Sequence, residues 1–77
     1  MGFRKYIIRN GGEEAWLTHI FLHGGQKVWQ YLPDARKAIT FETVHEARKY
    51  AKECRGRVQI LRMGRDGKGY GEDIGNE

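Results

Sequence analysis

The chain has 77 residues and a formal net charge of +4, with 14 Lys and Arg against ten Asp and Glu. A chain of this length predicts a single domain with a small core. Cys54 is the only cysteine, which excludes an intramolecular disulfide and favours a reducing, cytoplasmic location. No apolar run approaches the roughly 20 residues that a membrane-spanning helix needs, so we expect no contact with a membrane.

The first half of the chain predicts three strands. Residues 3–10 are rich in β-formers and end at a turn signal, Asn10-Gly11-Gly12. Residues 16–23 form the second predicted strand, and because both of its faces are partly apolar we expect it to be central or covered on both sides. Gly24-Gly25 ends this strand, and residues 27–32 form the third.

The second half of the chain contains the clearest element, a helix over residues 44–55. Residues 35–41 lead into it and fit either a helical turn or an extended segment. Thr43 and Glu46 have the spacing of a capping box, and Gly56 suits the left-handed position after the last turn. The apolar positions of the helix recur on one narrow face: Val44, Ala47, Ala51 and Cys54.

Residues 57–63 form the last predicted strand, which gives the order β-β-β-α-β. This order predicts an α+β fold, with a small antiparallel sheet of three to four strands and one helix packed on one face. Residues 64–77 contain five glycines, few apolar side chains and an acidic end. We therefore expect one domain over residues 1–63 and a flexible tail over residues 64–77.

Residues 5–61 contain a set of characteristic segments: KYIIRNGG, LTHI, the lone Trp29, the stretch ARKAITFETVHEARKYA and the final VQIL. Together these segments resemble small phage and prophage proteins. Proteins of this class include inhibitors of host defence, among them anti-CRISPR proteins. The resemblance implies a phage-type accessory protein in the cytoplasm of a host bacterium, and it carries no catalytic residue.

The residues themselves predict no catalytic or metal site. The chain has no serine, and Cys54 lies on the apolar face of the helix, near the end where the helix dipole disfavours a thiolate. His19 and His23 would lie about 13 Å apart on one strand, too far to share a metal ion. We therefore expect a protein that is not an enzyme and that needs no cofactor.

The basic residues of the helix predict a binding surface. Arg48, Lys52 and Arg55 fall within about 60° of one another on a helical wheel, beside the apolar face, and folding does not require them there. The proposed partner-binding residues of the helix and last strand are Arg48, Lys49, Lys52, Arg55, Arg57 and Arg62. Such a surface favours an anionic partner, although solubility alone would also account for it.

Three aromatic residues of the predicted strands, Trp16, Trp29 and Tyr31, are the second set of candidates. They either complete the core or lie on the sheet face that the helix leaves open, where they would contact a partner. The sequence thus predicts an inhibitor that binds a host protein or a protein–nucleic-acid complex. A module that binds DNA or RNA directly and a homodimeric assembly protein are the alternatives.

Overall fold

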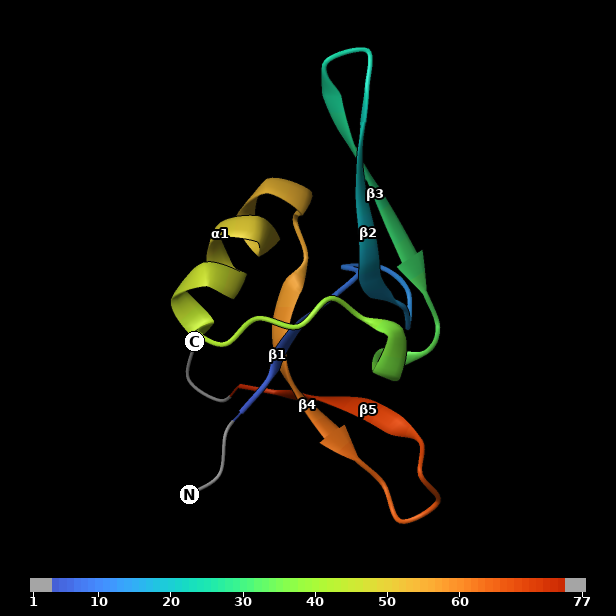
Figure 1. Ribbon diagram of the computed structural model, residues 1–77. Coiled ribbons are helices and arrows are strands. Elements are labelled where there is room, and N and C mark those ends of the chain that lie inside the picture. Colours follow the sequence, from blue (N-terminus) through green and yellow to red (C-terminus); the bar gives the residue numbers. More distant parts are fainter. Residues whose placement is uncertain (1–3, 75–77) are drawn as a thin grey trace.

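The computed structural model describes residues 4–74 and contains one antiparallel sheet, one α-helix and one 3₁₀ turn (Figure 1). The strand order across the sheet is β3-β2-β1-β4-β5, and every neighbouring pair is antiparallel. This confirms the predicted α+β class, although the described sheet has five strands instead of three to four. The elements are β1 (Tyr6–Arg9), β2 (Trp16–His23), β3 (Gln26–Leu32), η1 (Ala35–Lys37), α1 (Val44–Cys54), β4 (Arg57–Met63) and β5 (Gly69–Asp73).

The prediction of a flexible tail is wrong for its described part, because residues 69–73 form the edge strand β5 beside β4. A tight turn precedes this strand: Gly67 has a φ of +81°, and the Gly64 N–H donates to the Lys68 carbonyl over 2.7 Å. The two acidic residues of the strand then pair with β4, since Glu72 contacts Arg62 and Asp73 contacts Arg57. The rest of the predicted tail, residues 75–77, lies outside the described residues.

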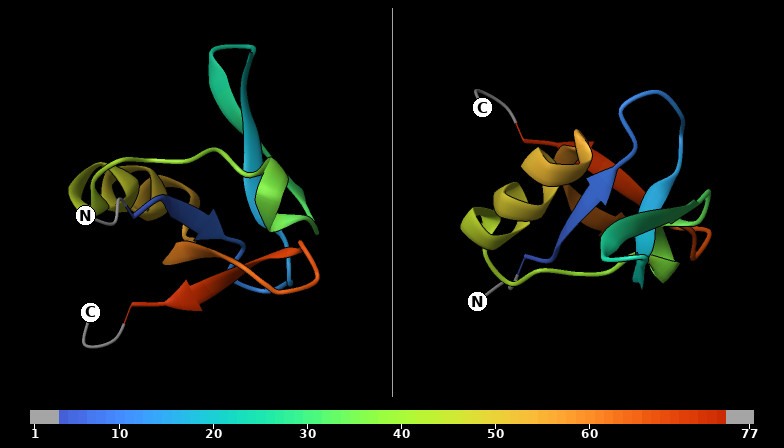
Figure 2. Two further views of the ribbon diagram at one scale, coloured as in Figure 1. Left: turned by 60° about the horizontal axis from the view of Figure 1, so that its bottom comes forward. Right: turned by 90° about the horizontal axis from the view of Figure 1, so that it is seen from above.

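Helix α1 forms where the sequence predicts it. The Thr43 hydroxyl accepts a hydrogen bond from the Glu46 N–H, which is one half of the predicted capping box. Ala47 and Ala51 are buried against the sheet, and their small side chains let the helix lie close to β1 and β4 (Figure 2). The helix ends one residue earlier than predicted, at Cys54.

The left-handed residue that ends the helix is Arg55, with a φ of +59°, and not Gly56 as the sequence suggested. Gly56 is required for a different reason. A Cβ atom at this position would lie 2.5 Å from the Ile8 Cγ2 atom and 2.8 Å from the Arg9 carbonyl oxygen. Glycine therefore allows the chain to pass directly over β1 as it leaves the helix.

The sheet is covered on both faces, and this differs from the prediction of one covered face. The first core cluster lies under α1 and contains Ile8, Leu17, Phe41, Ala47, Ala51 and Val58. A second cluster contains Ile7, Trp16, Ala35 and Ala38, so the segment around η1 covers this part of the sheet. Residues 35–41 combine the two predicted alternatives, because the 3₁₀ turn is followed by an extended stretch in which Phe41 pairs with Tyr6.

The outer half of the β2–β3 hairpin projects beyond the rest of the molecule (Figure 1). We call residues 19–30 the hairpin arm. Trp16, Leu17 and Thr18 at the base of β2 are buried, whereas the side chains of Phe21 and Leu22 in the arm are exposed. The pairing of β2 with β3 shifts register between Leu17 and His19, where the arm begins. Strand β2 lies between β3 and β1, which confirms its predicted central position, but its outer half is not covered on both sides.

Candidate anion-binding groove

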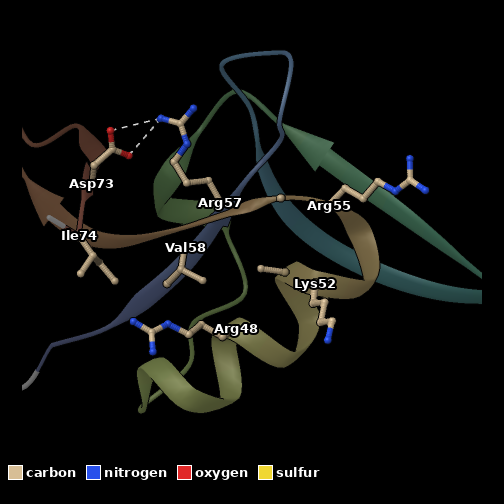
Figure 3. Close-up of a pocket in the computed structure, with 9 residues that line it drawn as sticks. Arg48, Lys52, Arg55, Arg57, Val58, Asp73 and Ile74 are labelled. Carbon is tan, nitrogen blue, oxygen red and sulfur yellow. Dashed lines mark hydrogen bonds and ion pairs between the residues drawn. The ribbon is translucent and has the colours of Figure 1, made fainter. Parts of the chain in front are cut away.

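An open groove of about 710 Å³ lies between α1, the start of β4 and the end of β5 (Figure 3). Four basic residues line it, and they belong to the predicted set: Arg48, Lys52, Arg55 and Arg57. The uncharged residues of its lining are Ala51, Gly56, Val58 and Ile74, and Asp73 is the one acidic residue among the described residues that line it. The groove thus joins an aliphatic floor to a predominantly positive rim.

Three different backbone features position the four basic residues. Arg48 and Lys52 are four residues apart on α1 and therefore lie on the same face of the helix. Arg55 is itself the left-handed residue that ends the helix, and Arg57 is the first residue of β4. Lys52 also lies in the last helical turn, where the negative end of the helix dipole stabilises a cation, so its charge contributes to folding as well.

The basic side chains do not all point the same way. In Figure 3, Arg48 and Arg57 extend along opposite sides of Val58 and Ile74, whereas Arg55 extends away from them at the far end. All four belong to exposed residues, which can rearrange around a ligand. Arg48 and Arg57 are consequently the pair best placed to hold a group that lies on the aliphatic floor.

A chain of hydrogen bonds holds Asp73 at one side of the groove. The Gln59 amide donates to the Asp73 carboxylate over 2.8 Å, and the Arg57 guanidinium lies 3.3 Å from the same carboxylate. These two contacts, the Gln59 hydrogen bond foremost, lower the pKa of Asp73 below its usual value. Gln59 is buried and accepts a hydrogen bond from the Trp16 indole N–H over 2.8 Å. The Asp73 carboxylate is therefore connected to the core through Gln59.

Two of the predicted basic residues do not line the groove. Lys49 is exposed elsewhere on α1, and Arg62 lies further along β4, where its guanidinium forms an ion pair with Glu72 over 2.9 Å. The helical periodicity correctly placed Arg48 and Lys52 on one face, whereas Arg55 lines the groove from a left-handed position beyond the helix. The periodicity could not show which basic residues of β4 would lie next to them.

The structure decides between the two predictions made for Trp16. Trp16 is 6% exposed and belongs to the second core cluster, so it completes the core, and the alternative of a partner contact is wrong for this residue. Trp29 and Tyr31 are partly buried against the first cluster. Partial burial, together with a hydrogen bond to Cys54, raises the pKa of Tyr31 above its usual value.

The exposed apolar residues of the hairpin arm were not predicted as a surface. Phe21, Leu22 and Val28 are each about half exposed or more. The signal for them was the Gly24-Gly25 turn, because large apolar residues directly beside a two-residue turn extend past the core that could cover them.

Residues 4–74 contain no group of three or more His, Cys, Asp or Glu side chains that could hold a metal ion. Among the same residues, no helix is both long enough and apolar enough to cross a membrane. Comparisons with protein-family models, with curated proteins and with solved structures found no significant match for this chain.

Substitution of Arg55 by glycine should remove a basic side chain from the groove without weakening the fold. A left-handed conformation costs a residue with a Cβ about 1–2 kcal/mol, whereas glycine adds about 0.5–1 kcal/mol of unfolded-chain entropy. We therefore expect the free energy of unfolding of Arg55→Gly to stay the same or to rise by up to about 1 kcal/mol. Urea unfolding followed by circular dichroism measures it, and a clear loss of stability would contradict the view that folding does not use this side chain.

Proposed function

We propose that this protein is a non-enzymatic binding protein that holds an acidic segment of a partner protein in the groove between α1 and β4. The observation that carries the proposal is the joining of four basic residues to an aliphatic floor. Arg48 and Arg57 would pair with carboxylates, for which the planar guanidinium is well suited, while the floor around Val58 would take an apolar side chain of the same segment.

The composition of the groove favours a protein over a nucleic acid as the partner. Proteins that bind single-stranded nucleic acids stack the bases on aromatic side chains, and none of the described residues that line this groove is aromatic. An aliphatic floor instead accommodates the side chains of a peptide. Direct binding of DNA or RNA is the second candidate, because the same four cations could follow a phosphate backbone.

The biological setting that we propose rests on the resemblance of residues 5–61 to small phage proteins. In that setting the partner is a host macromolecule, and the most concrete form of the function is inhibition of a nucleic-acid-dependent defence system, as anti-CRISPR proteins do. The net charge of +4 is opposite to that of a DNA mimic. Inhibition would therefore depend on binding an acidic surface of the host system.

Reversal of charge in the groove tests this function. The probe is a fluorescein-labelled peptide of about 12 residues that alternates Glu pairs with single Leu residues, and its binding is measured by fluorescence anisotropy. We expect the variant Arg48→Glu/Lys52→Glu to bind it at least about tenfold more weakly, a change of about 1.4 kcal/mol. The matched control is Lys37→Glu/Lys49→Glu, which changes the net charge equally at exposed positions outside the groove.

The control and a second set of probes decide between the candidates. The proposal fails if the wild-type protein does not bind the peptide at a concentration of several hundred micromolar, or if both variants lose binding equally. Single-stranded and duplex oligonucleotides of similar length are titrated at two salt concentrations. If the oligonucleotides bind and the peptide does not, and if their affinity falls steeply with salt concentration, the partner that binds in the groove is a nucleic acid.

A further inference from the structure

The two edges of the sheet differ in how well they are protected against pairing with a strand of another molecule. Strand β5 forms one edge, and it is short, contains two glycines and carries the acidic residues Glu72 and Asp73. Strand β3 forms the other edge, and its seven residues contain a single charge, Lys27. Proteins protect edge strands with charges, proline or short length, since an unprotected edge is a template for another strand. Among residues 4–74, β3 is therefore the longer and less protected of the two edges.

The hairpin turn determines which backbone groups of β3 point outward. Gly24 and Gly25 both have positive φ, +60° and +81°, so they form the two-residue turn typical of hairpins. The pair that flanks such a turn, His23 and Gln26, exchanges backbone hydrogen bonds, and the pairs alternate from there. The N–H and C=O groups of alternate β3 residues therefore point away from β2: Lys27, Trp29 and Tyr31.

The side chains beside this edge are apolar. Val28 lies directly opposite Phe21 on β2, so both point to the same face of the hairpin arm. Their exposed fractions are 46% and 50%. Val28 thus lies at the edge of the sheet, with an exposed aromatic neighbour behind it and unpaired backbone positions on either side.

We propose that β3 pairs antiparallel with β3 of a second copy of this chain, about a two-fold axis that passes beside Val28. In this register the two valines face each other as a non-hydrogen-bonded pair, and the backbone groups of Lys27 and Trp29 meet those of the partner. The side chains of Phe21 and Val28 from both copies form one apolar row across four strands. Each Trp29 lies opposite the partner's Lys27, so no like charges face each other.

The choice of a second copy over a different protein follows from this self-complementarity. An antiparallel pair of identical strands places the same residues on both sides of the axis, and the only charge of β3 meets an aromatic ring. The acidic residues at the β5 edge oppose a second round of pairing there, so assembly stops at the dimer. The basic grooves lie on the β4 side of the sheet, so both remain accessible in the dimer.

Sedimentation velocity tests the dimer. We expect the wild-type protein to form dimers at tens to hundreds of micromolar, and Val28→Lys to weaken the dimer at least about tenfold, because it places two like charges directly opposite each other. The matched control is Met63→Lys, at an exposed apolar position at the end of β4 and away from the arm, which should leave the dimer intact. Circular dichroism shows that each variant is folded.

A disulfide tests the register. In a Cys54→Ala background, Val28→Cys should form a disulfide-linked dimer on mild oxidation, since the paired Cβ atoms would lie close enough to be bridged. Leu22→Cys is the control and should remain monomeric under denaturing, non-reducing conditions. A wild-type protein that stays monomeric at several hundred micromolar overturns the proposal, and so does a dimer that survives Val28→Lys or crosslinks equally at both positions.

Discussion

Replacement of Gly56 by alanine is expected to destabilise the protein by about 1–3 kcal/mol, the cost of forcing an additional methyl group into a closely packed site. The new methyl would lie 2.5 Å from Ile8 Cγ2 and 2.8 Å from the Arg9 carbonyl oxygen. Ile8 is fully buried in the first core cluster, and the carbonyl belongs to the backbone of β1, so neither neighbour can move freely. A domain of this size has a total stability of only about 3–5 kcal/mol, so much of the population could unfold.

Urea unfolding of Gly56→Ala, compared with the wild type, measures this cost. The matched control is Gly12→Ala, at an exposed position where the nearest atom to a new Cβ would be the Asn10 Oδ1 atom at 3.8 Å. We expect the control to change the free energy of unfolding by less than about 0.5 kcal/mol. If the two variants were equally stable, the chain at Gly56 would not pass as close to β1 as the structure places it.

A chain that ends at Lys68 should lose about 3 kcal/mol or more of stability, because it lacks β5. Five residue pairs join β5 to β4, and the deletion also removes the carboxylate that accepts the Gln59 hydrogen bond. Gln59 and Trp16 are both buried beside Gly71, so their side chains would become exposed to solvent. Loss of a strand that covers a buried pair is costly in a domain with so small a core.

Thermal unfolding followed by circular dichroism measures the effect of this truncation. A chain that ends at Ile74 is the control, since it keeps β5 and separates its contribution from that of residues 75–77. The sequence alone suggested a flexible tail over residues 64–77. If the chain that ends at Lys68 unfolded at the same temperature as the full chain, that suggestion would be correct and the pairing of β5 would be unimportant.

The parts of the fold that the sequence predicted are those with local signals. The helix is marked by the Thr43 cap and by Ala47 and Ala51 at helical spacing, and all three behave as predicted. Strand β5 has no such signal, because it is held by backbone pairing and by ion pairs to β4, and its own residues are mostly glycine and acid. A count of apolar residues cannot detect an edge strand of this kind.

The candidate groove was predictable only where a single element determines it. Helical periodicity places Arg48 and Lys52 on one face of α1, and both line the groove. Arg55 lines it from a left-handed position beyond the helix, which the periodicity could not indicate. The contributions of Asp73 and Ile74 depend on β5 and could not be inferred without it. The burial of Trp16 remained one of two alternatives for a related reason: the η1 segment, which covers its face of the sheet, was predicted only as an ambiguous stretch.

The positions of the two tryptophans make each of them an internal optical probe of a different part of the molecule. Trp16 donates its indole hydrogen bond to Gln59, next to Gly71 of β5, so its emission should respond to detachment of that strand. Trp29 lies in the hairpin arm beside Lys27. Replacement of either tryptophan by phenylalanine would leave a protein with one tryptophan, whose emission can be excited selectively, and local opening at the two opposite ends of the sheet could be followed separately without an added label.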